Sequence, residues 1–462
     1  MRRSKQRKTA RQRKNSCKYR LNRFEKYRLI SQLSVVIQRK FPELYDELSK
    51  LPDYRKKPRY EVRELIVSGL LMFLFRQKSR NQADNKSKNL DYQDNVKKFF
   101  GIKVADMDTV DRYLRFLNPD YLETIKQDMF REIIRSKVLQ KYRYQGKYYQ
   151  LAIDGSGLQS YDYEPYPGCP FKEYKSGKKV WTTYILEAKI VTTSGFALSL
   201  ASEWIENPTN ESFDKQDSEN KAFKRLSAKL KRNFPRLPLM LLLDGLYPNS
   251  PVFEICKTNN WAAIITLKDK SLKSVQEQIA DMLLFNQYKQ TSHVDKQGAW
   301  WHKNDYKVFQ NVEYQKYTLH VIETLFEKKH EKTNELEKTR FVHISNIEIS
   351  EKSAHKLSLA GRLRWKIENE GFNNQKNSDY NAEHKYSRTN FNATKNYYQL
   401  LQIADMINQF VYKQQWIQKF IIKHELTLMA VIELIMSYLK VYEFDDEKLI
   451  NTLLSQKVQL RY

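Results

Sequence analysis

Cysteine is scarce in this chain, which has only three in 462 residues, at wide and irregular intervals (Cys17, Cys169 and Cys256). Such spacing excludes a disulfide framework and a cysteine-ligated zinc site, and it is typical of a reducing compartment. Long apolar runs are also lacking, and no uninterrupted stretch approaches the roughly 20 residues that cross a bilayer. We therefore expect a cytoplasmic protein that does not enter the membrane.

Several catalytic patterns are missing too. The eight histidines are scattered without metal-ligand spacing, and no Ser-His-Asp or Cys-His arrangement is suggested by the sequence. No glycine-rich phosphate loop occurs, and such a loop is what cradles the phosphates of ATP in many enzymes. An ATP-driven enzyme is therefore not expected.

Acidic residues are outnumbered by basic ones, 54 against 81, which gives a formal net charge of +27. The resulting positive potential favours polyanions and attracts them from solution. Thirty tyrosines and seven tryptophans add rings that can stack on unpaired bases beside those charges. The composition predicts DNA or RNA as a partner, although a basic ribosome-associated protein can have the same composition.

The N-terminal third is basic and then helical. Residues 1–28 contain 13 Lys or Arg and almost no acid, a block that cannot fold alone and is expected to bind phosphate. Residues 29–145 have helical periodicity, and we predict a helical DNA-binding domain there. Its segment Thr109–Arg115 resembles a helix that can face DNA, with a solvated amphipathic face as the alternative.

The periodicity changes to strand-like near Tyr148, and an α/β domain is predicted over residues 146–415. We expect strands at 148–153, 184–191, 196–202, 239–243 and 262–267, and helices at 211–233 and 248–257. A β-rich insertion is expected at about 272–352, with strands at 306–312, 317–325 and 340–347 and a charged loop from Glu327 to Lys338. Residues 416–462 are predicted to be helical.

Two aspartates end apolar runs that are predicted as buried strands. Asp154 follows Leu151-Ala152-Ile153, and Asp244 follows Leu241-Leu242-Leu243. A glycine comes after each, which lets the backbone turn away and a substrate approach closely. An Asp-Gly after an apolar run is more often an ordinary turn than a metal ligand, but the recurrence of the same context favours a shared site.

A third carboxylate, Glu368, lies on a stretch predicted to be helical. Leu363 and Ile367 are four residues apart and can face the core, while Arg364 and Glu368 share the adjacent stripe and can both face a site. The alternative is that Arg364 and Glu368 form an ordinary surface ion pair.

Converging carboxylates are suited to hold Mg²⁺ or Mn²⁺ against a phosphate, because these hard cations prefer oxygen ligands. Two such ions about 3.5–4 Å apart can stabilise both the entering and the leaving oxygen of an in-line displacement. The sequence therefore predicts a metal-dependent site that cuts nucleic acid, built from Asp154, Asp244 and Glu368.

In combination these residues resemble the DDE transposases of bacterial insertion sequences, in the group whose last carboxylate lies in a Tyr-Arg-Glu-Lys signature. The resemblance covers roughly Leu151 to Phe410. It is carried by Asp154, Asp244-Gly245-Leu246-Tyr247, Arg364-Trp365-Lys366-Ile367-Glu368, and Lys215-Gln216-Asp217-Ser218-Glu219 with the helix after it.

The resemblance implies an RNase H-like catalytic domain with a β-rich insertion and two divalent ions held by Asp154, Asp244 and Glu368. It implies cut-and-paste transposition, in which strands are cut at the terminal inverted repeats of double-stranded DNA and transferred to target DNA. A homodimer in the synaptic complex and a location at the bacterial nucleoid follow. Arg364 corresponds to the signature arginine and is expected to grip a phosphate of the DNA end.

The signature is incomplete in this chain. Its tyrosine position is Gly361 and its lysine position is Gln375, with Lys376 one residue later. A lysine stem is long enough for Lys376 to reach the same phosphate, and we assign it to DNA binding. In related transposases a tryptophan of the insertion stacks on a flipped base, and Trp300 and Trp301 lie in the corresponding region, with a packing role as the alternative.

Two other functions stay open. One is a non-catalytic DNA-binding protein derived from a transposase, and the other is a structure-selective nuclease on the same scaffold. Metal-dependent cleavage separates the first from a transposase, and nicking without strand transfer would favour the second.

Overall fold

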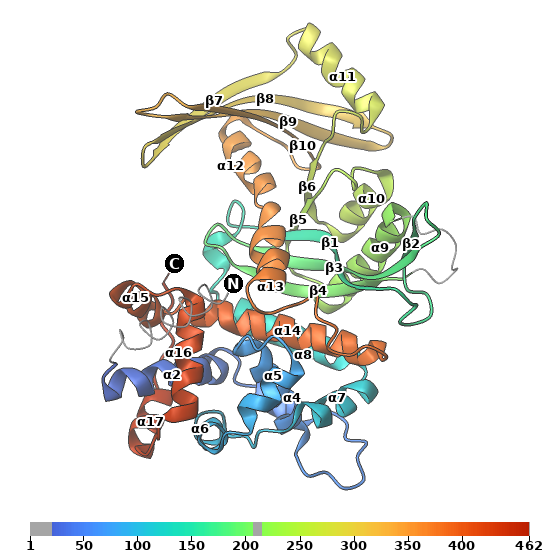
Figure 1. Cartoon of the computed structure of the whole chain (residues 1–462). Helices are drawn as coiled ribbons and strands as arrows, with labels where there is room; N and C mark the ends of the chain where they lie inside the picture. Colours follow the sequence, from blue (N-terminus) through green and yellow to red (C-terminus); the bar gives the residue numbers. More distant parts are fainter. Residues whose placement is uncertain (1–20, 207–214, 462) are drawn as a thin grey trace. The chain divides into compact units, whose positions relative to one another are not determined.

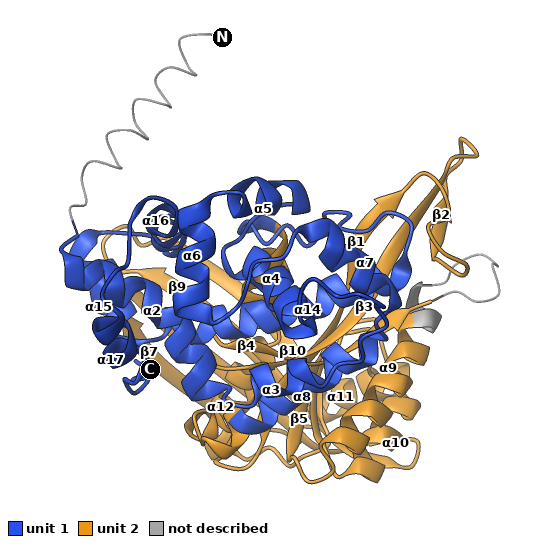
Figure 2. Ribbon diagram, turned by 90° about the horizontal axis from the view of Figure 1, so that it is seen from below, with its two compact units in different colours: residues 1–132, 377–462 blue, residues 133–376 orange. Residues whose placement is uncertain are grey.

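The computed structural model describes residues 21–206 and 215–461, with the side chains of 215–218 left out. Most of the basic segment predicted at 1–28 therefore lies outside the described residues. The chain forms two compact units (Figure 2). Unit 1 consists of residues 1–132 and 377–462, and unit 2 of residues 133–376.

Unit 1 is helical and combines the N-terminal and C-terminal parts of the chain (Figure 1). Its helices are α2 (Arg23–Lys40), α3 (Leu44–Ser49), α4 (Val62–Leu74), α5 (Arg80–Ser87), α6 (Leu90–Phe100), α7 (Met107–Phe116), most of α8 (Pro119–Arg135), α14 (Phe391–Tyr412), α15 (Gln415–His424), α16 (Leu428–Val441) and α17 (Glu447–Leu454).

Helix α14 is the central helix of unit 1. It is buried along most of its length and packs against α2, α4 and α7. Gly69 of α4 permits this packing, because a Cβ at that position would lie 3.0 Å from Cδ1 of Leu400. The Asn396 side chain donates to the carbonyl oxygens of Leu114 and Leu117, both at 2.8 Å, and so closes the end of α7. The segment after residue 377 thus completes the N-terminal helical unit, while the domain boundaries drawn from the sequence stay a prediction.

Unit 2 is built on a mixed sheet that, in the described part of the chain, has ten strands. The order is β2-β3-β1-β5-β6-β10-β9-β8-β7, and β4 pairs with β3. The strands are β1 (Tyr149–Tyr161), β2 (Phe171–Glu173), β3 (Lys179–Val191), β4 (Ala197–Ile205), β5 (Leu239–Leu243), β6 (Ala262–Thr266), β7 (Lys289–Gln297), β8 (Trp300–Tyr314), β9 (Tyr317–His330) and β10 (Leu336–Ser345).

Helices flank this sheet (Figure 1). Helix α9 packs on β3 and β4, α12 packs on β6 to β9, and a π-helical segment, η2, packs on β1, β3 and β4. The helical elements of unit 2 are η1 (Gln140–Tyr142), α9 (Lys215–Asn233), α10 (Ser250–Asn259), α11 (Lys273–Leu284), α12 (Glu351–Arg362), η2 (Ile367–Asn373) and α13 (Asn374–Asn377).

The α/β prediction, with helices before and after a central mixed sheet, is confirmed. Two finer expectations were wrong. The first is that β1 does not end at Asp154 but continues to Tyr161, because antiparallel β3 still pairs with residues 155–161 after parallel β5 has ended. The second is the charged loop described below.

Within residues 21–206 and 215–461, no helix is both long and apolar enough to cross a membrane.

The charged loop predicted from Glu327 to Lys338 is a β-hairpin instead, and only its tip is a turn. β9 continues to His330 and β10 begins at Leu336. Opposite charges pair across the two strands: Lys338 bonds Glu327 at 2.5 Å, and Lys328 lies 3.6 Å from Glu337. Cross-strand pairs of this kind stabilise a hairpin whose sequence is too polar to predict a strand. Helix α11 and strand β7, in the same insertion, were not predicted.

Candidate active site

Asp154, within β1, and Asp244, directly after β5, lie level with each other where these two parallel strands are neighbours. Ala152 of β1 pairs with Leu242 of β5, and every other pair of these strands keeps the same offset of 90 in residue number. Asp244 is also numbered 90 higher than Asp154, and each lies two residues beyond that last pair. The charge of Asp244 acts on the Asp154 carboxyl, so the two carboxylates are neighbours at this end of the two strands.

The carboxylate of Asp154 is held by the backbone and by an arginine. It accepts from the Gly155 N–H at 2.9 Å and from Nη1 of Arg364 at 3.3 Å. Burial raises the pKa of Asp154 to about 6; Arg364 opposes the rise, and the charges of Asp244 and Glu219 add to it. Asp154, Asp244 and Glu219 together carry more negative charge than Arg364 alone can balance. A bound cation would neutralise part of this charge.

Glu219 of α9 is a further carboxylate at this place; the sequence analysis named it as part of a segment that resembles the family and gave it no role in the site. It is buried, and its Oε1 accepts from the Tyr247 hydroxyl at 2.6 Å. A Cβ at Gly155 would lie 3.0 Å from its Oε2, so the glycine makes room for this carboxylate. Burial, followed by the charges of Glu219, Asp244 and Asp154, raises the pKa of Tyr247 well above its usual value. Tyr247 is therefore a permanently protonated donor to Glu219.

Gly245 makes room for a lysine. A Cβ at Gly245 would lie 2.6 Å from Cε of Lys268, which belongs to the loop after β6 and is exposed. The glycine after Asp244 thus lets a basic side chain cross beside the second aspartate. Lys268 is another residue of this site that the sequence did not single out.

The segment η2, which carries Glu368, packs on the face of the sheet from which Asp154 projects. Lys189 of β3 pairs with Ala152, two residues before Asp154, and so shares that face. The Lys189 stem lies against η2, where a Cβ at Gly371 would be 3.2 Å from its Cδ. The segment that carries Glu368 therefore packs on the same face of the sheet as the Asp154 side chain.

Glu368 itself is partly buried and, among the residues that the structure describes, forms no hydrogen bond or ion pair. The next acid of the segment, Glu370, is ion-paired with Lys366. No hydrogen bond or ion pair links Glu368 to the residues around Asp154 and Asp244 in the described part of the chain. Its role as the third ligand stays a prediction.

The π-helical form of η2 gives a physical reason for the late position of Lys376. Lys376 follows Glu368 by eight residues, whereas the signature has seven. A π turn contains about one residue more than an α turn, so eight residues across η2 make about the two turns that seven make in an α-helix. Nζ of Lys376 donates to the Gly157 carbonyl at 2.8 Å, on the strand that carries Asp154. Gln375, at the signature position, is buried.

The signature tyrosine has no room at Gly361. A Cβ there would lie 2.7 Å from Nε2 of His343, whose ring fills the space. Burial, with Arg362 and Arg364 adding to it, lowers the pKa of His343 to about 4, so this ring is neutral at physiological pH. A buried neutral histidine thus packs where the family pattern has a tyrosine.

The two tryptophans at the start of β8 have different surroundings. Trp300 packs edge-on against His330, with ring centroids 4.6 Å apart, and Nζ of Lys328 lies 3.9 Å from its ring centroid. Trp301 is 43% exposed, and Nζ of Lys296 lies 5.1 Å from its ring centroid. An exposed ring beside a cation is what base stacking requires, so Trp301 is the better candidate of the two. The stacking role stays a prediction.

The donor set fits Mg²⁺ or Mn²⁺ in kind, because carboxylate oxygens are the ligands that these ions prefer. Burial is the main cause of the raised pKa of Asp154, and the charges of its neighbours Asp244 and Glu219 add to it. In residues 21–206 and 215–461, however, no three His, Cys, Asp or Glu side chains converge closely enough to form a metal site as they stand.

We expect the free energy of unfolding to depend on pH, because the folded protein disfavours the ionised form of Asp154. Its folded pKa of about 6 lies above its usual 3.8, so the folded state binds this proton more tightly and stability falls as the pH rises between these values. The shift corresponds to at most about 3 kcal/mol. Thermal unfolding at pH 4.5 and pH 7.5 measures it, and Asp154→Asn should raise the Tm more at pH 7.5. An equal change in Tm at both pH values would contradict the raised pKa.

A family model described as "Transposase DDE domain" matches residues 145–404. This range is more than half of the chain and includes all three predicted carboxylate ligands. No protein in the curated collection searched matches the chain.

Proposed function

Because the chain belongs to the DDE transposase family, we propose that it binds the ends of an insertion sequence, cuts DNA strands there and transfers them to a target. The observation that carries the proposal is the level pair Asp154 and Asp244, with Arg364 bonded to Asp154 and with burial, followed by the neighbouring carboxylates, raising the pKa of Asp154. A carboxylate with a perturbed pKa that lies next to further carboxylates is typical of functional sites.

We assign Asp154, Asp244 and Glu368 as the ligands of two divalent ions, Mg²⁺ or Mn²⁺. Such ions supply an activated water and stabilise the entering and leaving oxygens of the phosphodiester. The chain itself contributes position, because β1 and β5 fix the two aspartates on a rigid sheet. Glu368 lies on η2, which packs on the same side of that sheet, and its carboxylate forms no hydrogen bond or ion pair among the described residues.

Arg364 has two successive roles in this proposal. Before metal binding its guanidinium donates to Asp154 and balances part of the acidic charge. With the carboxylates neutralised by bound cations, Arg364 would be able to donate to a phosphate of the DNA end, for which its planar donor pair is suited. Lys376, beside the strand of Asp154, and Lys268, beside Asp244, add positive charge for the same backbone.

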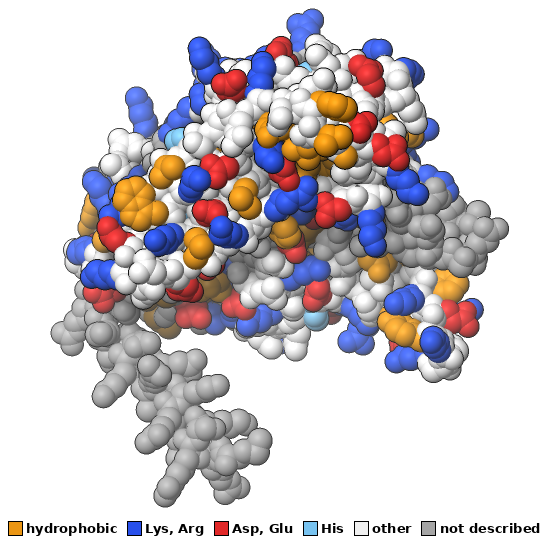
Figure 3. Space-filling view, turned by 90° about the horizontal axis from the view of Figure 1, so that it is seen from above, with side chains coloured by type: hydrophobic (Ala, Val, Ile, Leu, Met, Phe, Trp, Pro, Cys, Tyr) orange, Lys and Arg blue, Asp and Glu red, His pale blue; other side chains and the backbone are white. Residues whose placement is uncertain are grey.

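The substrates in this proposal are double-stranded DNA with terminal inverted repeats and a target duplex. A homodimer would hold two ends together, since both ends must be joined to one target, and the protein would act at the bacterial nucleoid. The net charge of +27 supports a DNA partner. On the face seen in Figure 3, Lys and Arg side chains are spread among acidic ones, so this face does not present one uniformly basic patch.

The experiment that tests the proposal uses a labelled DNA fragment that carries one flanking inverted repeat, with Mg²⁺ or Mn²⁺ and a target plasmid. We expect cleavage at the repeat boundary and joined product in the plasmid. Binding without cleavage under either metal would favour a non-catalytic DNA-binding protein. Cleavage without joining would favour a structure-selective nuclease.

Glu219 offers a separate prediction for the same site. We expect Glu219→Gln to raise the Mg²⁺ concentration that gives half-maximal cleavage about tenfold, which is about 1.4 kcal/mol, because a negative charge next to Asp154 is lost. Tyr247→Phe removes only the hydroxyl bonded to Glu219 and should have a smaller effect on this concentration. A metal titration of the cleavage rate measures both. Equal metal requirements for wild type and Glu219→Gln would show that this carboxylate does not act on the cations.

A further inference from the structure

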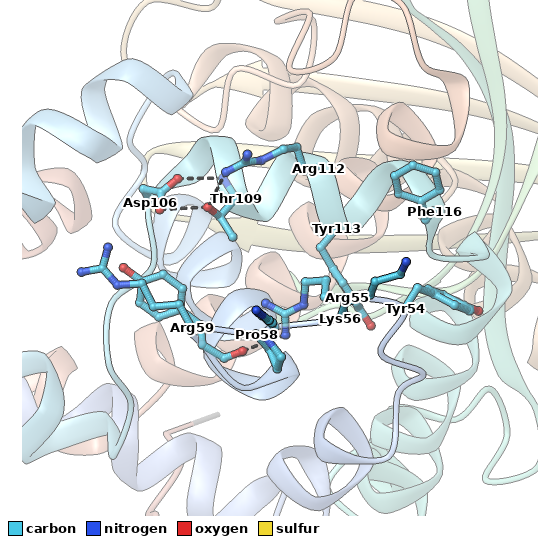
Figure 4. A pocket seen from close by; sticks show the side chains of 12 residues that line it. Tyr54, Arg55, Lys56, Pro58, Arg59, Asp106, Thr109, Arg112, Tyr113 and Phe116 are labelled. Atoms are coloured by element: carbon cyan, nitrogen blue, oxygen red, sulfur yellow. Dashed lines mark hydrogen bonds between the residues drawn. The ribbon is translucent and has the colours of Figure 1, made fainter.

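A pocket in unit 1 combines exposed rings with basic side chains, and the proposed function does not use it. Its volume is about 640 Å³, and it lies between one face of α7 and the loop that precedes α4 (Figure 4). The lining residues are Asp106, Thr109, Arg112, Tyr113 and Phe116 from α7 and its N-cap, and Tyr54, Arg55, Lys56, Lys57, Pro58, Arg59 and Tyr60 from the loop. The spacing of the first group defines a single face of the helix.

The loop wall of this pocket is held in shape before any ligand arrives. Both carboxylate oxygens of Asp53 accept from Arg55 at 2.8 Å, and the same guanidinium donates to the Tyr60 carbonyl at 2.7 Å. The Tyr113 hydroxyl donates to the Pro52 carbonyl at 2.8 Å and so ties the loop to α7. A preformed wall lowers the entropy lost when a ligand binds.

The pocket carries positive charge that no acid balances. Lys56, Lys57 and Arg59 are exposed, and within residues 21–206 and 215–461 none of them forms an ion pair. Arg112, by contrast, is held through Thr109, at 2.9 Å, to Asp106. Three uncompensated cations at one pocket are suited to a phosphate group.

Two large rings at the pocket are exposed to solvent. Phe116 is 73% exposed and Tyr54 is 60% exposed. Figure 4 shows these two rings at the same end of the pocket and Arg59 at the other end. A duplex presents only its phosphate backbone and groove edges to such a pocket, whereas an unpaired base presents a flat face that can stack on exposed rings.

We propose that this pocket binds one unpaired nucleotide of a DNA strand, with its phosphate on Lys56, Lys57 and Arg59 and its base against Tyr54 or Phe116. The volume lies within the roughly 300–1,000 Å³ of small-molecule sites. The inference rests on the proposed function, because it takes DNA as the protein's partner. It adds that the helical unit distinguishes an unpaired strand from a duplex.

The test is a fluorescence anisotropy titration of the full-length protein in EDTA, with a labelled blunt duplex and with the same duplex carrying a short single-stranded tail. We expect the tailed duplex to bind about tenfold more tightly, in line with the stacking of one or two bases. Tyr54→Ala with Phe116→Ala should remove this preference and leave the affinity for the blunt duplex unchanged. Lys57→Gln should weaken binding of the tail and reduce its salt dependence.

Matched controls are available in the same unit. Phe24→Ala changes another exposed ring and Lys88→Gln another exposed lysine, and both should retain the preference. Equal binding of the blunt and tailed duplexes by wild type would overturn the pocket inference while leaving the proposed function intact. Binding of neither duplex would count against both. Displacement of the tail by micromolar deoxyadenosine monophosphate would also overturn it, since the ligand would then be a free nucleotide.

Discussion

Replacing Asp154 or Asp244 by asparagine is expected to reduce metal-dependent DNA cleavage by about 1,000-fold or more and to leave DNA binding within about twofold of wild type. Asp154 of β1 and Asp244, directly after the adjacent strand β5, are neighbours, so each substitution removes one charged oxygen from the same pair. Loss of a ligand that positions a catalytic metal typically costs several kcal/mol of transition-state stabilisation. Cleavage of a labelled end fragment and anisotropy on the same fragment measure the two properties separately.

Asp162→Asn is the matched control for this prediction. Asp162 follows the same strand, β1, but its side chain is exposed. It should cut DNA at the wild-type rate. If Asp154→Asn cut DNA as fast as Asp162→Asn does, the catalytic carboxylates would have to lie elsewhere in the chain.

Glu368→Gln is expected to have an effect of the same size, with Glu370→Gln as its control. The two glutamates are neighbours on η2, but Glu370 is occupied by Lys366, whereas Glu368 forms no ion pair within the described residues. A carboxylate without a partner on the face of Asp154 is available to a cation, and a paired one is not. The cleavage rate at saturating Mg²⁺ should therefore fall about 1,000-fold for Glu368→Gln and less than about threefold for Glu370→Gln.

The opposite result would reassign the third carboxylate. If Glu368→Gln retained cleavage while Glu219→Gln abolished it, the third ligand would be Glu219, which already lies next to Asp154. If Glu370→Gln alone abolished cleavage, the pair between Glu370 and Lys366 would have to open in the active protein.

The two aspartates illustrate which features of the site can be predicted from the sequence and which cannot. Asp244 directly follows the buried strand β5, as the apolar run predicts, because Pro238 and Asp244-Gly245 bound that run clearly. Asp154 was expected at a strand end and lies inside β1 instead. Gly155 and the residues after it give no apolar signal, and the strand continues only because β3 supplies hydrogen-bonding partners.

The residues that the sequence did not single out depend on packing between distant elements. The helix that carries Glu219 was predicted, but the turn of it that faces the site is set by how α9 packs on β3 and β4. Lys268 could not be linked to Gly245 without the pairing of β5 and β6. The extra residue before Lys376 was visible in the sequence, whereas the π-helical form that accommodates it was not.

Metal rescue of Asp154→Cys would test most directly whether these carboxylates hold the ions that cut DNA. A thiolate binds Mg²⁺ poorly and accepts softer ions such as Mn²⁺ more readily. We expect this variant to be inactive in Mg²⁺ and to recover cleavage at least about tenfold in Mn²⁺, while Asp154→Ala stays inactive in both. Cleavage by Asp154→Ala at the wild-type rate in either metal would contradict a metal site at Asp154.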